Sequence, residues 1–251
     1  MVKIRFGEGE GWSWQLLLPG VPAVSNRGYL GWCSVSLLSF HEKGRLHYGL
    51  FDTGNVGDRA ELLSSLKRRK IDPSEIEFVI LSHLHYDHIL NSEMFKEAEV
   101  YVLHSEVEYL ESGARGDLYY PKSYIREIKR KLTAVSAKDK LYEGSFIELP
   151  GHTKGSMGFL IGRTLFAGDA LKYSSEAKMR RIINAWYSLK LANKSLQTML
   201  SLADIIIPGH DSPIAISNGS VKYQHRKEVG ITLRGYGNKL TIKEPESQQQ
   251  P

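Results

Sequence analysis

Residues 78–88, FVILSHLHYDH, join a short apolar strand to a cluster of polar side chains. Imidazole nitrogens and carboxylate oxygens are ligands suited to Zn²⁺, Fe²⁺ or Mn²⁺. The i, i+2 spacing lets His83 and His85 point the same way from an extended segment. Asp87 and His88 follow, so they turn toward a second position. The stretch therefore predicts a metal site at the carboxyl end of a strand.

Three later polar residues share this setting, each directly after or within a short apolar strand. They are His152 in Gly151-His152-Thr153, Asp169 after Gly168, and His210 after Gly209. Each of these turns taken singly is an ordinary loop. Together with the first cluster they make seven candidate ligands, enough for two metal ions that share one carboxylate.

The pattern around these residues predicts one α/β (α+β) domain over residues 1–243. Antiparallel strands come first and mixtures of strands and helices follow, which suggests two sheets with helices packed outside. Residues 244–251, EPESQQQP, have the composition of a disordered tail. We expect a helix near residues 89–95, directly after the histidine cluster.

The remaining elements are predicted from apolar periodicity and from Gly and Pro breaks. The predicted strands are residues 3–6, 13–18, 31–40, 45–52, 77–82, 99–103, 146–149, 158–161, 164–167 and 205–207. The predicted helices are residues 58–70, 105–111, 123–132 and 193–202.

Composition limits the class of protein. The 251 residues hold 33 Lys and Arg against 28 Asp and Glu, and the net charge of +5 is too small to argue for a nucleic-acid partner. The single cysteine, Cys33, allows no intrachain disulfide, excludes a zinc site built of cysteines and reads as a small buried hydrophobe. No apolar run reaches the roughly 18 residues of a membrane span, and the N-terminus lacks a signal-peptide pattern. We expect a cytoplasmic protein.

The sequence resembles the metallo-β-lactamase superfamily in its HxHxDH motif at 83–88 and in the Gly-His-Thr, Gly-Asp and Pro-Gly-His segments that follow. Asp52-Thr53-Gly54 looks like the family's early Asp-Thr-Gly. The resemblance implies a four-layer αββα sandwich and a two-metal centre, with zinc first and iron or manganese as alternatives. It implies a first metal held by His83, His85 and His152, a second held by Asp87, His88 and His210, and a shared ligand in Asp169.

Such a centre would serve hydrolysis. Two cations about 3.5–4 Å apart acidify a shared water, and the bridging hydroxide attacks a polarised substrate. Asp87 could pass a proton to the leaving group. Asp52 and Asp211 either accept hydrogen bonds from ligating imidazoles or simply form turns.

Among compact single-domain relatives the chain resembles acyl-homoserine lactonases and small esterases. Lactonases place a Tyr three residues after the bridging Asp, whereas this chain has Lys172 there and Tyr173 one residue later. Tyr173 therefore remains a candidate oxyanion donor. Tyr119, Tyr120 and Tyr124 either line the mouth of the site or cover the core.

The favoured function is hydrolysis of a small ester, lactone or thioester. A phosphodiesterase or nuclease would use the same metal pair. A mononuclear iron enzyme like the persulfide dioxygenases and a non-catalytic binding protein are further alternatives. The expected partner is a small-molecule substrate, with no membrane, and a homodimer is left open.

Overall fold

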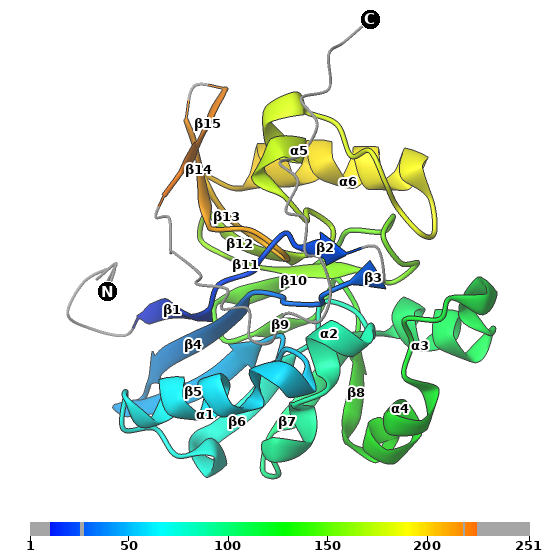
Figure 1. Ribbon diagram of the computed structural model, residues 1–251. Coiled ribbons are helices and arrows are strands. Elements are labelled where there is room, and N and C mark those ends of the chain that lie inside the picture. Colours follow the sequence, from blue (N-terminus) through cyan, green and yellow to red (C-terminus); the bar gives the residue numbers. More distant parts are fainter. Residues whose placement is uncertain (1–10, 26–27, 218, 225–251) are drawn as a thin grey trace, which may run out of the picture.

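The computed structural model describes residues 11–25, 28–217 and 219–224, which form two mixed β-sheets with helices on their outer faces (Figure 1). The first sheet has the order β1-β4-β5-β6-β7-β8. Strands β1, β4 and β5 are antiparallel, and β5 to β8 are parallel. The strands are β1 Trp12–Leu18, β4 Val35–Glu42, β5 Arg45–Phe51, β6 Ile76–Ile80, β7 Glu99–Leu103 and β8 Leu132–Val135.

The second sheet has the order β15-β14-β13-β12-β11-β10-β9, in which only the β12–β13 pair is parallel. Its strands are β9 Lys140–Leu141, β10 Gly144–Glu148, β11 Met157–Ile161, β12 Thr164–Gly168, β13 Ile205–Pro208, β14 Ile214–Ser217 and β15 Ser220–Tyr223. A separate ribbon pairs β2 Val24–Ser25 with β3 Gly28–Tyr29.

Six α-helices are assigned in the described residues. They are α1 Arg59–Lys67, α2 Tyr86–Ile89, α3 His104–Glu111, α4 Lys122–Ile128, α5 Ser174–Met179 and α6 Leu189–Leu202. None of them is long and apolar enough to cross a bilayer.

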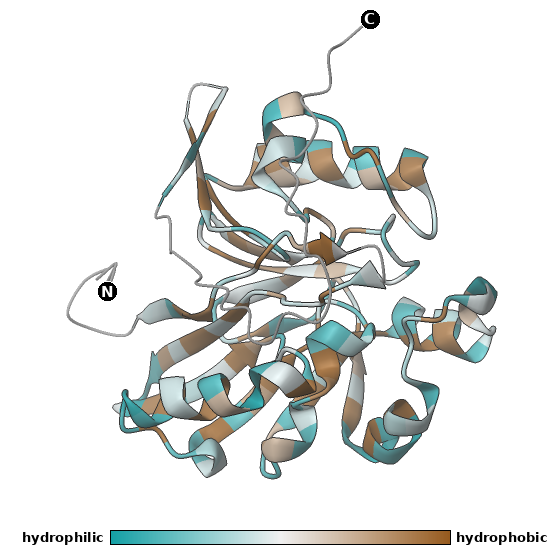
Figure 2. Ribbon diagram, viewed as in Figure 1, coloured by the Kyte–Doolittle hydropathy of each residue, from teal (hydrophilic) through white to brown (hydrophobic). Residues whose placement is uncertain are grey.

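Three apolar clusters hold the layers together. Between the sheets, Phe40 and Phe78 of the first sheet share a cluster with Phe159 and Phe166 of the second. The outer faces are covered separately, by a cluster that includes α1 and by one that includes α6. Strands buried on both faces have nearly continuous apolar sequences, as Figure 2 shows for the strands between the helix layers. This arrangement confirms the predicted αββα sandwich.

Several predicted helices have different bounds: α1 ends at Lys67 rather than at residue 70, and α6 begins at Leu189 rather than at residue 193. The helix expected at residues 89–95 instead begins at Tyr86, and a 3₁₀ turn at Ser92–Met94 follows it. The helix expected at residues 123–132 ends at Ile128, because Leu132 pairs with β7 as the first residue of β8. The predicted strand 3–6 and the tail 244–251 lie outside the described residues.

The topology gathers strand ends at one edge. β5 and β6 are parallel neighbours, as are β12 and β13, so the carboxyl ends of each pair lie together. Such ends are where open α/β sheets place their ligands. Asp52 follows β5 directly, Asp169 follows β12 directly, and His83 and His210 come within three residues of β6 and β13.

Candidate metal centre

The segment after β6 supplies ligands in two conformations. His83 and His85 lie in extended backbone, and His85 is the N-cap residue of α2 with φ −72° and ψ 149°. Asp87 and His88 lie within that short helix and are buried. The change from strand to helical backbone turns the second pair away from the first, so one segment faces two positions.

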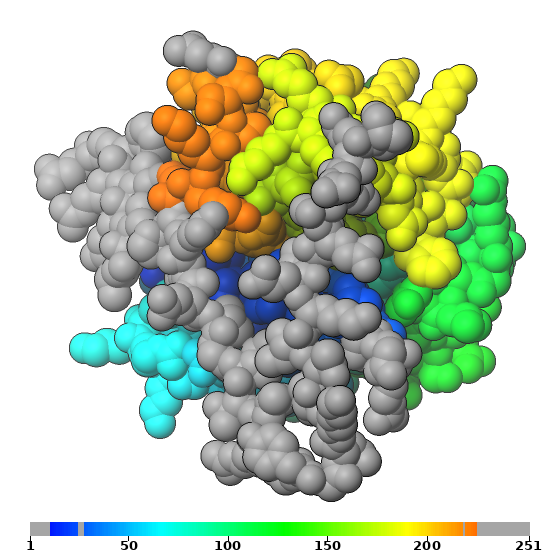
Figure 3. All heavy atoms as spheres, turned by 45° about the horizontal axis from the view of Figure 1, so that its top comes forward, coloured from blue at the N-terminus to red at the C-terminus, as the bar shows by residue number. Residues whose placement is uncertain are grey.

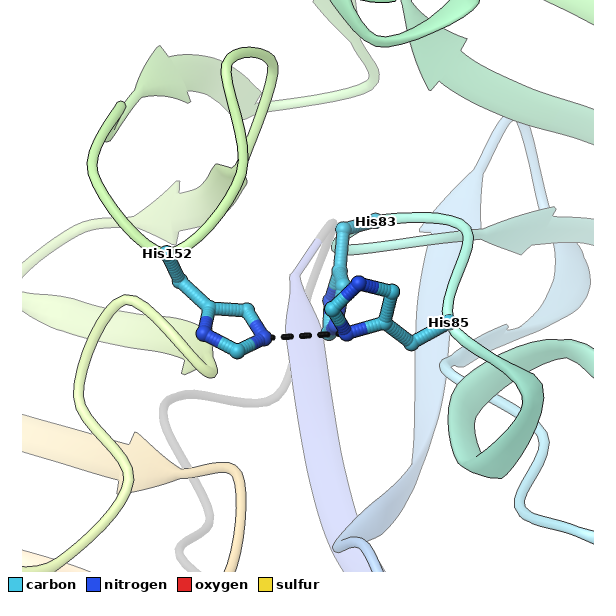
Figure 4. Close-up of side chains that lie close together, drawn as sticks. All are labelled: His83, His85 and His152. Carbon is cyan, nitrogen blue, oxygen red and sulfur yellow. Dashed lines mark hydrogen bonds between the residues drawn. The ribbon is translucent and has the colours of Figure 1, made fainter. Parts of the chain in front are cut away.

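The first position is a trio of histidines from two loops. His83 and His85 point toward His152, which comes from the loop after β10 (Figure 4). Nε2 of His152 lies 3.0 Å from Nδ1 of His85. All three offer a ring nitrogen within 4.8 Å of the others, which is close enough for one ion to contact all three.

The second position combines Asp87, His88 and His210, whose ligand atoms also lie within 4.8 Å of one another. Oδ2 of Asp87 is 3.4 Å from Nε2 of His210 and 3.8 Å from Nε2 of His88. Both imidazoles are fully buried.

Asp169 lies between the two positions. Its Oδ2 is 3.3 Å from Nε2 of His152 in the first trio. Its Oδ1 is 3.0 Å from Nε2 of His210 and 3.3 Å from Nε2 of His88 in the second. One carboxylate therefore presents one oxygen to each position. Lys172 lies on the same side, with Nζ 3.3 Å from Oδ2 of Asp169.

Four of the five ring nitrogens that face away from these positions are held by other groups, whereas Nδ1 of His152 is buried without a hydrogen-bond partner among the described residues. The contacts are His83 Nδ1 to Ser82 Oγ at 3.0 Å, His85 Nε2 to Asp117 Oδ2 at 2.9 Å, His88 Nδ1 to Asp52 Oδ2 at 2.8 Å and His210 Nδ1 to the Trp32 carbonyl at 3.0 Å. Such outer contacts fix ring orientation and tautomer in metal sites.

Four of the inward-facing atoms lack hydrogen-bond partners in the part of the chain that the structure describes, whereas Nδ1 of His85 and Nε2 of His152 contact each other. Nε2 of His83, His88 and His210 and Oδ1 of Asp169 are buried and make no hydrogen bond. Buried polar atoms are almost always satisfied, so each such atom calls for an explanation. Donor atoms of the type that divalent metals bind, converging from every side, fit a pair of metal ions.

The electrostatics at His83, His152 and Asp169 favour the same interpretation, whereas at His88 burial is outweighed by the charges of Cys33 and of the nearby carboxylates, which raise the pKa. Burial lowers the pKa of His83 and of His152 well below the usual value, and the neighbouring imidazoles and Lys172 add to this effect. Burial would raise the pKa of Asp169, but the charges of His210 and Lys172 outweigh it and hold that pKa well below the usual range. Neutral imidazoles and an ionised carboxylate are the forms that bind metal.

Asp52 and Asp211 have different partners, although the sequence offered the same two roles for both. Asp52 accepts hydrogen bonds from the Ser82 backbone N–H at 2.7 Å and hydroxyl at 2.8 Å and contacts His88, so it orients a candidate ligand. Asp211 accepts from the Ser174 N–H and the Tyr223 hydroxyl instead. The idea that Asp211 orients an imidazole is therefore wrong, and Asp211 forms a turn contact.

Two carboxylates near the site were missed from the sequence. Asp117 contacts the outer nitrogen of His85, as described above. Glu106 is fully buried in α3, where Oε1 accepts from the Leu84 N–H and the Tyr120 hydroxyl. Oε2 accepts from the Thr153 hydroxyl and the Gly155 N–H. Glu106 thus joins the two loops that carry the histidine trio, and no local motif marks it.

The three tyrosines divide between the two roles considered. Tyr119 packs on His85, with ring centroids 5.8 Å apart, and is half-buried. Tyr120 is buried against Glu106, and Tyr124 packs on the core while its hydroxyl accepts from the Glu93 N–H. Tyr119 and Tyr120 therefore both contact a candidate ligand, since the ring centroids of Tyr120 and His85 lie 4.9 Å apart, whereas Tyr124 covers the core.

Cys33 lies beside the centre without facing the two positions described. It is 1% exposed, as expected for a small buried hydrophobe, and lies with Asp52 and His88 within 4.8 Å. Burial raises the pKa of its thiol to about 12. A protonated thiol is a poor metal ligand.

Gly209 leaves the space that Asp169 fills. A Cβ at residue 209 would lie 2.1 Å from Oδ1 of Asp169 and 2.9 Å from the Gly168 carbonyl carbon. No side chain fits at 209 while the carboxylate keeps its place.

The chain is similar to proteins with known family and structure. A family model described as the metallo-beta-lactamase superfamily matches residues 33–210. Metallo-beta-lactamase domain-containing protein 1 of Xenopus laevis is 27% identical over 191 residues, which cover 71% of this chain and 72% of that protein. An N-acyl homoserine lactonase of Bacillus sp is 25% identical over 180 residues, or 66% of this chain and 70% of the lactonase.

Solved structures share the fold. AidC, a dizinc quorum-quenching lactonase, superimposes with a TM-score of 0.63 at 18% identity over 91% of this chain and 98% of its own. The family model spans most of the chain and includes every candidate ligand from His83 to His210. The chain therefore belongs to the metallo-beta-lactamase superfamily.

Proposed function

We propose that the protein is a dinuclear metal hydrolase that acts on a small ester, lactone or thioester. His83, His85 and His152 would hold one ion, and Asp87, His88 and His210 the other. Asp169 would bind both. The observation that carries this proposal is the convergence of unpartnered, buried donor atoms on two adjacent positions, with one oxygen of Asp169 toward each.

Bound cations would supply an acidified water and would polarise the substrate's carbonyl oxygen. The chain's own residues supply the rest. The carboxylate of Asp87 can take a proton and pass it to the leaving group. The ammonium group of Lys172 places positive charge beside the centre, where negative charge develops on the substrate. We propose Tyr173, the residue after Lys172, as a second hydrogen-bond donor to the substrate's carbonyl oxygen.

The choice of substrate class rests on the relatives. A relative of comparable length is named an N-acyl homoserine lactonase. Lys172 takes the place of the tyrosine expected in lactonases, so we propose ester-type bonds generally. Zinc is the proposed metal, with iron or manganese as alternatives.

Metal content and turnover, measured on the same preparation, test the proposal. We expect two equivalents of metal per chain by elemental analysis after loading with Zn²⁺, Fe²⁺ or Mn²⁺. We expect hydrolysis of p-nitrophenyl acetate or of a member of a lactone panel, with loss of turnover in chelator and recovery when metal is restored.

Other outcomes would overturn the proposal in distinguishable ways. Cleavage of bis-p-nitrophenyl phosphate without turnover of any carboxyl ester would indicate a phosphodiesterase or nuclease. One iron per chain with oxygen consumption on a thiol substrate would indicate an iron oxygenase. No retained metal would indicate a binding protein.

A further inference from the structure

A cavity of about 480 Å³ lies beside the candidate metal centre. It is bounded by the segment that follows α3 and by the segment that precedes α6, which meet at one edge of the molecule in the green and yellow of Figure 3. Its volume falls within the range of small-molecule sites. Its lining includes Tyr109, Arg115, Asp117, Leu118, Tyr119 and Trp186.

Most of the cavity wall is apolar and aromatic. Trp186 packs against Tyr119, with ring centroids 5.2 Å apart, and Tyr109 closes the wall from α3. Leu118 is 94% exposed and Trp186 is 51% exposed. Large apolar side chains held open around a concave surface mark a binding site more often than isolated surface residues do.

The charged side chains of this wall are already engaged. Asp117 uses Oδ2 for His85 and Oδ1 for the Tyr119 N–H at 2.9 Å. The guanidinium of Arg115 lies 4.5 Å from the centroid of the Tyr187 ring and donates to the Tyr187 carbonyl. The wall therefore suits a neutral apolar group better than an ion.

The same wall reaches the histidine trio. Asp117 and Tyr119 both line the cavity and both contact His85, whose Nδ1 is 3.0 Å from His152. A molecule with its reacting bond at the metal centre could therefore extend an attached group into the cavity past Tyr119.

The backbone that shapes the wall adopts a costly conformation. Residues 113–116 all have positive φ, including Ala114 at 48° and Arg115 at 51°. Left-handed backbone is strained for residues other than glycine. Strain of this kind persists where surrounding contacts hold it, and it clusters at ligand sites.

We propose that this cavity binds the neutral alkyl or aryl group of the substrate, so that the enzyme prefers esters, lactones or thioesters with a medium-length apolar substituent. This inference rests on the proposed hydrolase function. It adds a specificity determinant, the wall formed by Leu118, Tyr119 and Trp186, to the reaction proposed above.

The test compares two substrate series on zinc-loaded enzyme, p-nitrophenyl alkanoates from acetate to octanoate and alkyl acetates from methyl to octyl. In at least one of the two series, kcat/KM should rise by about fourfold for each added methylene until the cavity is filled. About fourfold is the increase expected when a methylene group is fully buried. In Leu118→Asn and Trp186→Ala the increase per methylene should fall to twofold or less. Leu63→Asn, which changes an exposed leucine on α1, should keep the wild-type increase.

A binding measurement separates this inference from the proposed function. N-hexylacetamide, a neutral analogue that resists cleavage, should change the fluorescence of Trp186 saturably in wild type and in Leu63→Asn. The change should vanish in Trp186→Phe and weaken at least fivefold in Leu118→Asn. This result without any ester turnover would contradict the hydrolase and support the cavity as an apolar site. Flat chain-length profiles in both series, or unchanged profiles in Leu118→Asn and Trp186→Ala, would overturn the inference, as would no turnover together with no fluorescence change.

Discussion

Four of the five candidate imidazoles in this centre have a hydrogen-bonding partner on the outer ring nitrogen. For His85 the constraint is the carboxylate of Asp117, 2.9 Å from Nε2, which leaves Nδ1 to face His152. For His88 it is Asp52, a residue with φ of 57°. The orientation of these two histidines thus depends on partners that lie far away in the sequence.

The Asp117→Asn substitution tests that dependence. Both carboxylate oxygens accept hydrogen bonds, so asparagine must turn an NH₂ group toward the Tyr119 N–H or toward His85. We expect metal affinity to fall about 10- to 100-fold, measured by competition with a chromophoric chelator. Asp211→Asn is the matched control and should keep wild-type affinity, because Asp211 contacts no imidazole. Equal affinities for wild type and Asp117→Asn would contradict the assignment.

Glu176 gives a pH-dependent prediction. Burial raises the pKa of this carboxyl from 4.5 to about 7, although it accepts the N–H groups of Lys172 and Tyr173. The unfolded chain releases the proton near the ordinary value and the folded chain retains it until about pH 7. The contribution of Glu176 to stability therefore falls as pH rises through that window.

In Glu176→Gln the neutral side chain can still accept both N–H groups, so this loss should disappear. Relative to wild type, the free energy of unfolding of the variant should rise between pH 4.5 and 7 by up to about 3 kcal/mol. Urea titrations of metal-free protein across this range measure the difference. A difference that is independent of pH would show that Glu176 ionises normally.

The candidate ligands and one supporting residue, Asp52, could be predicted from the sequence, whereas the supports Asp117 and Glu106 could not. His83, His85, Asp87 and His88 are recognisable because their spacing within six residues is itself the signal. Asp117 has no spacing relation to His85, which lies 32 residues earlier. Its role depends on tertiary contact alone.

Helices and strands could be predicted where residues close together in the sequence determine them. The apolar strands β6, β7 and β12 and the helix α6 were expected because continuous or periodic apolar residues mark them. β8 was not predicted, and its first residue, Leu132, was included in a helix, since its strand conformation depends on pairing with β7. β14 and β15 were missed, although Asn218-Gly219 between alternating residues is a hairpin signal.

Glu106 connects helix α3 to both histidine loops, and its substitution tests whether this helix supports the candidate metal centre. In Glu106→Gln, either orientation of the amide places an NH₂ group against a backbone N–H, of Leu84 or of Gly155. A buried hydrogen-bond mismatch costs about 1–3 kcal/mol. We expect lower stability and also weaker metal binding, because both histidine loops lose their shared anchor.

Glu108→Gln is the control on the same helix. The carboxylate of Glu108 is 50% exposed and pairs with Lys154 at the surface, where ion pairs contribute little. Urea denaturation and chelator competition, run on both variants, compare the two sites. Equal results for the two would show that Glu106 does not position the loops.

In the whole molecule, the proposed ligands come from both sheets. The segment after β6 supplies the first four, and loops after β10, β12 and β13 supply His152, Asp169 and His210. Bound ions would therefore join the two halves of the sandwich across the edge where they meet. The family and the αββα fold were both predicted from the order of the motifs, and both are confirmed. The prediction was possible because the motifs follow the ends of strands.

Metal removal should consequently destabilise the entire fold. Binding at 1,000 times Kd stabilises a protein by about 4 kcal/mol, which corresponds to roughly 10 °C in Tm for a chain of this size. Calorimetry of zinc-loaded and chelator-treated protein should show this decrease, and His152→Ala should show a smaller one. Identical Tm values would mean that no ion links the sheets.

Gly209 limits which mutations the gene can accept at this position. Its lack of a side chain leaves the volume that Asp169 fills, since a Cβ there would overlap Oδ1 at 2.1 Å. Even alanine, the mildest replacement, would force this carboxylate out of place. A saturation library screened for activity should therefore find codon 209 as intolerant as the histidine codons, although it encodes no functional group.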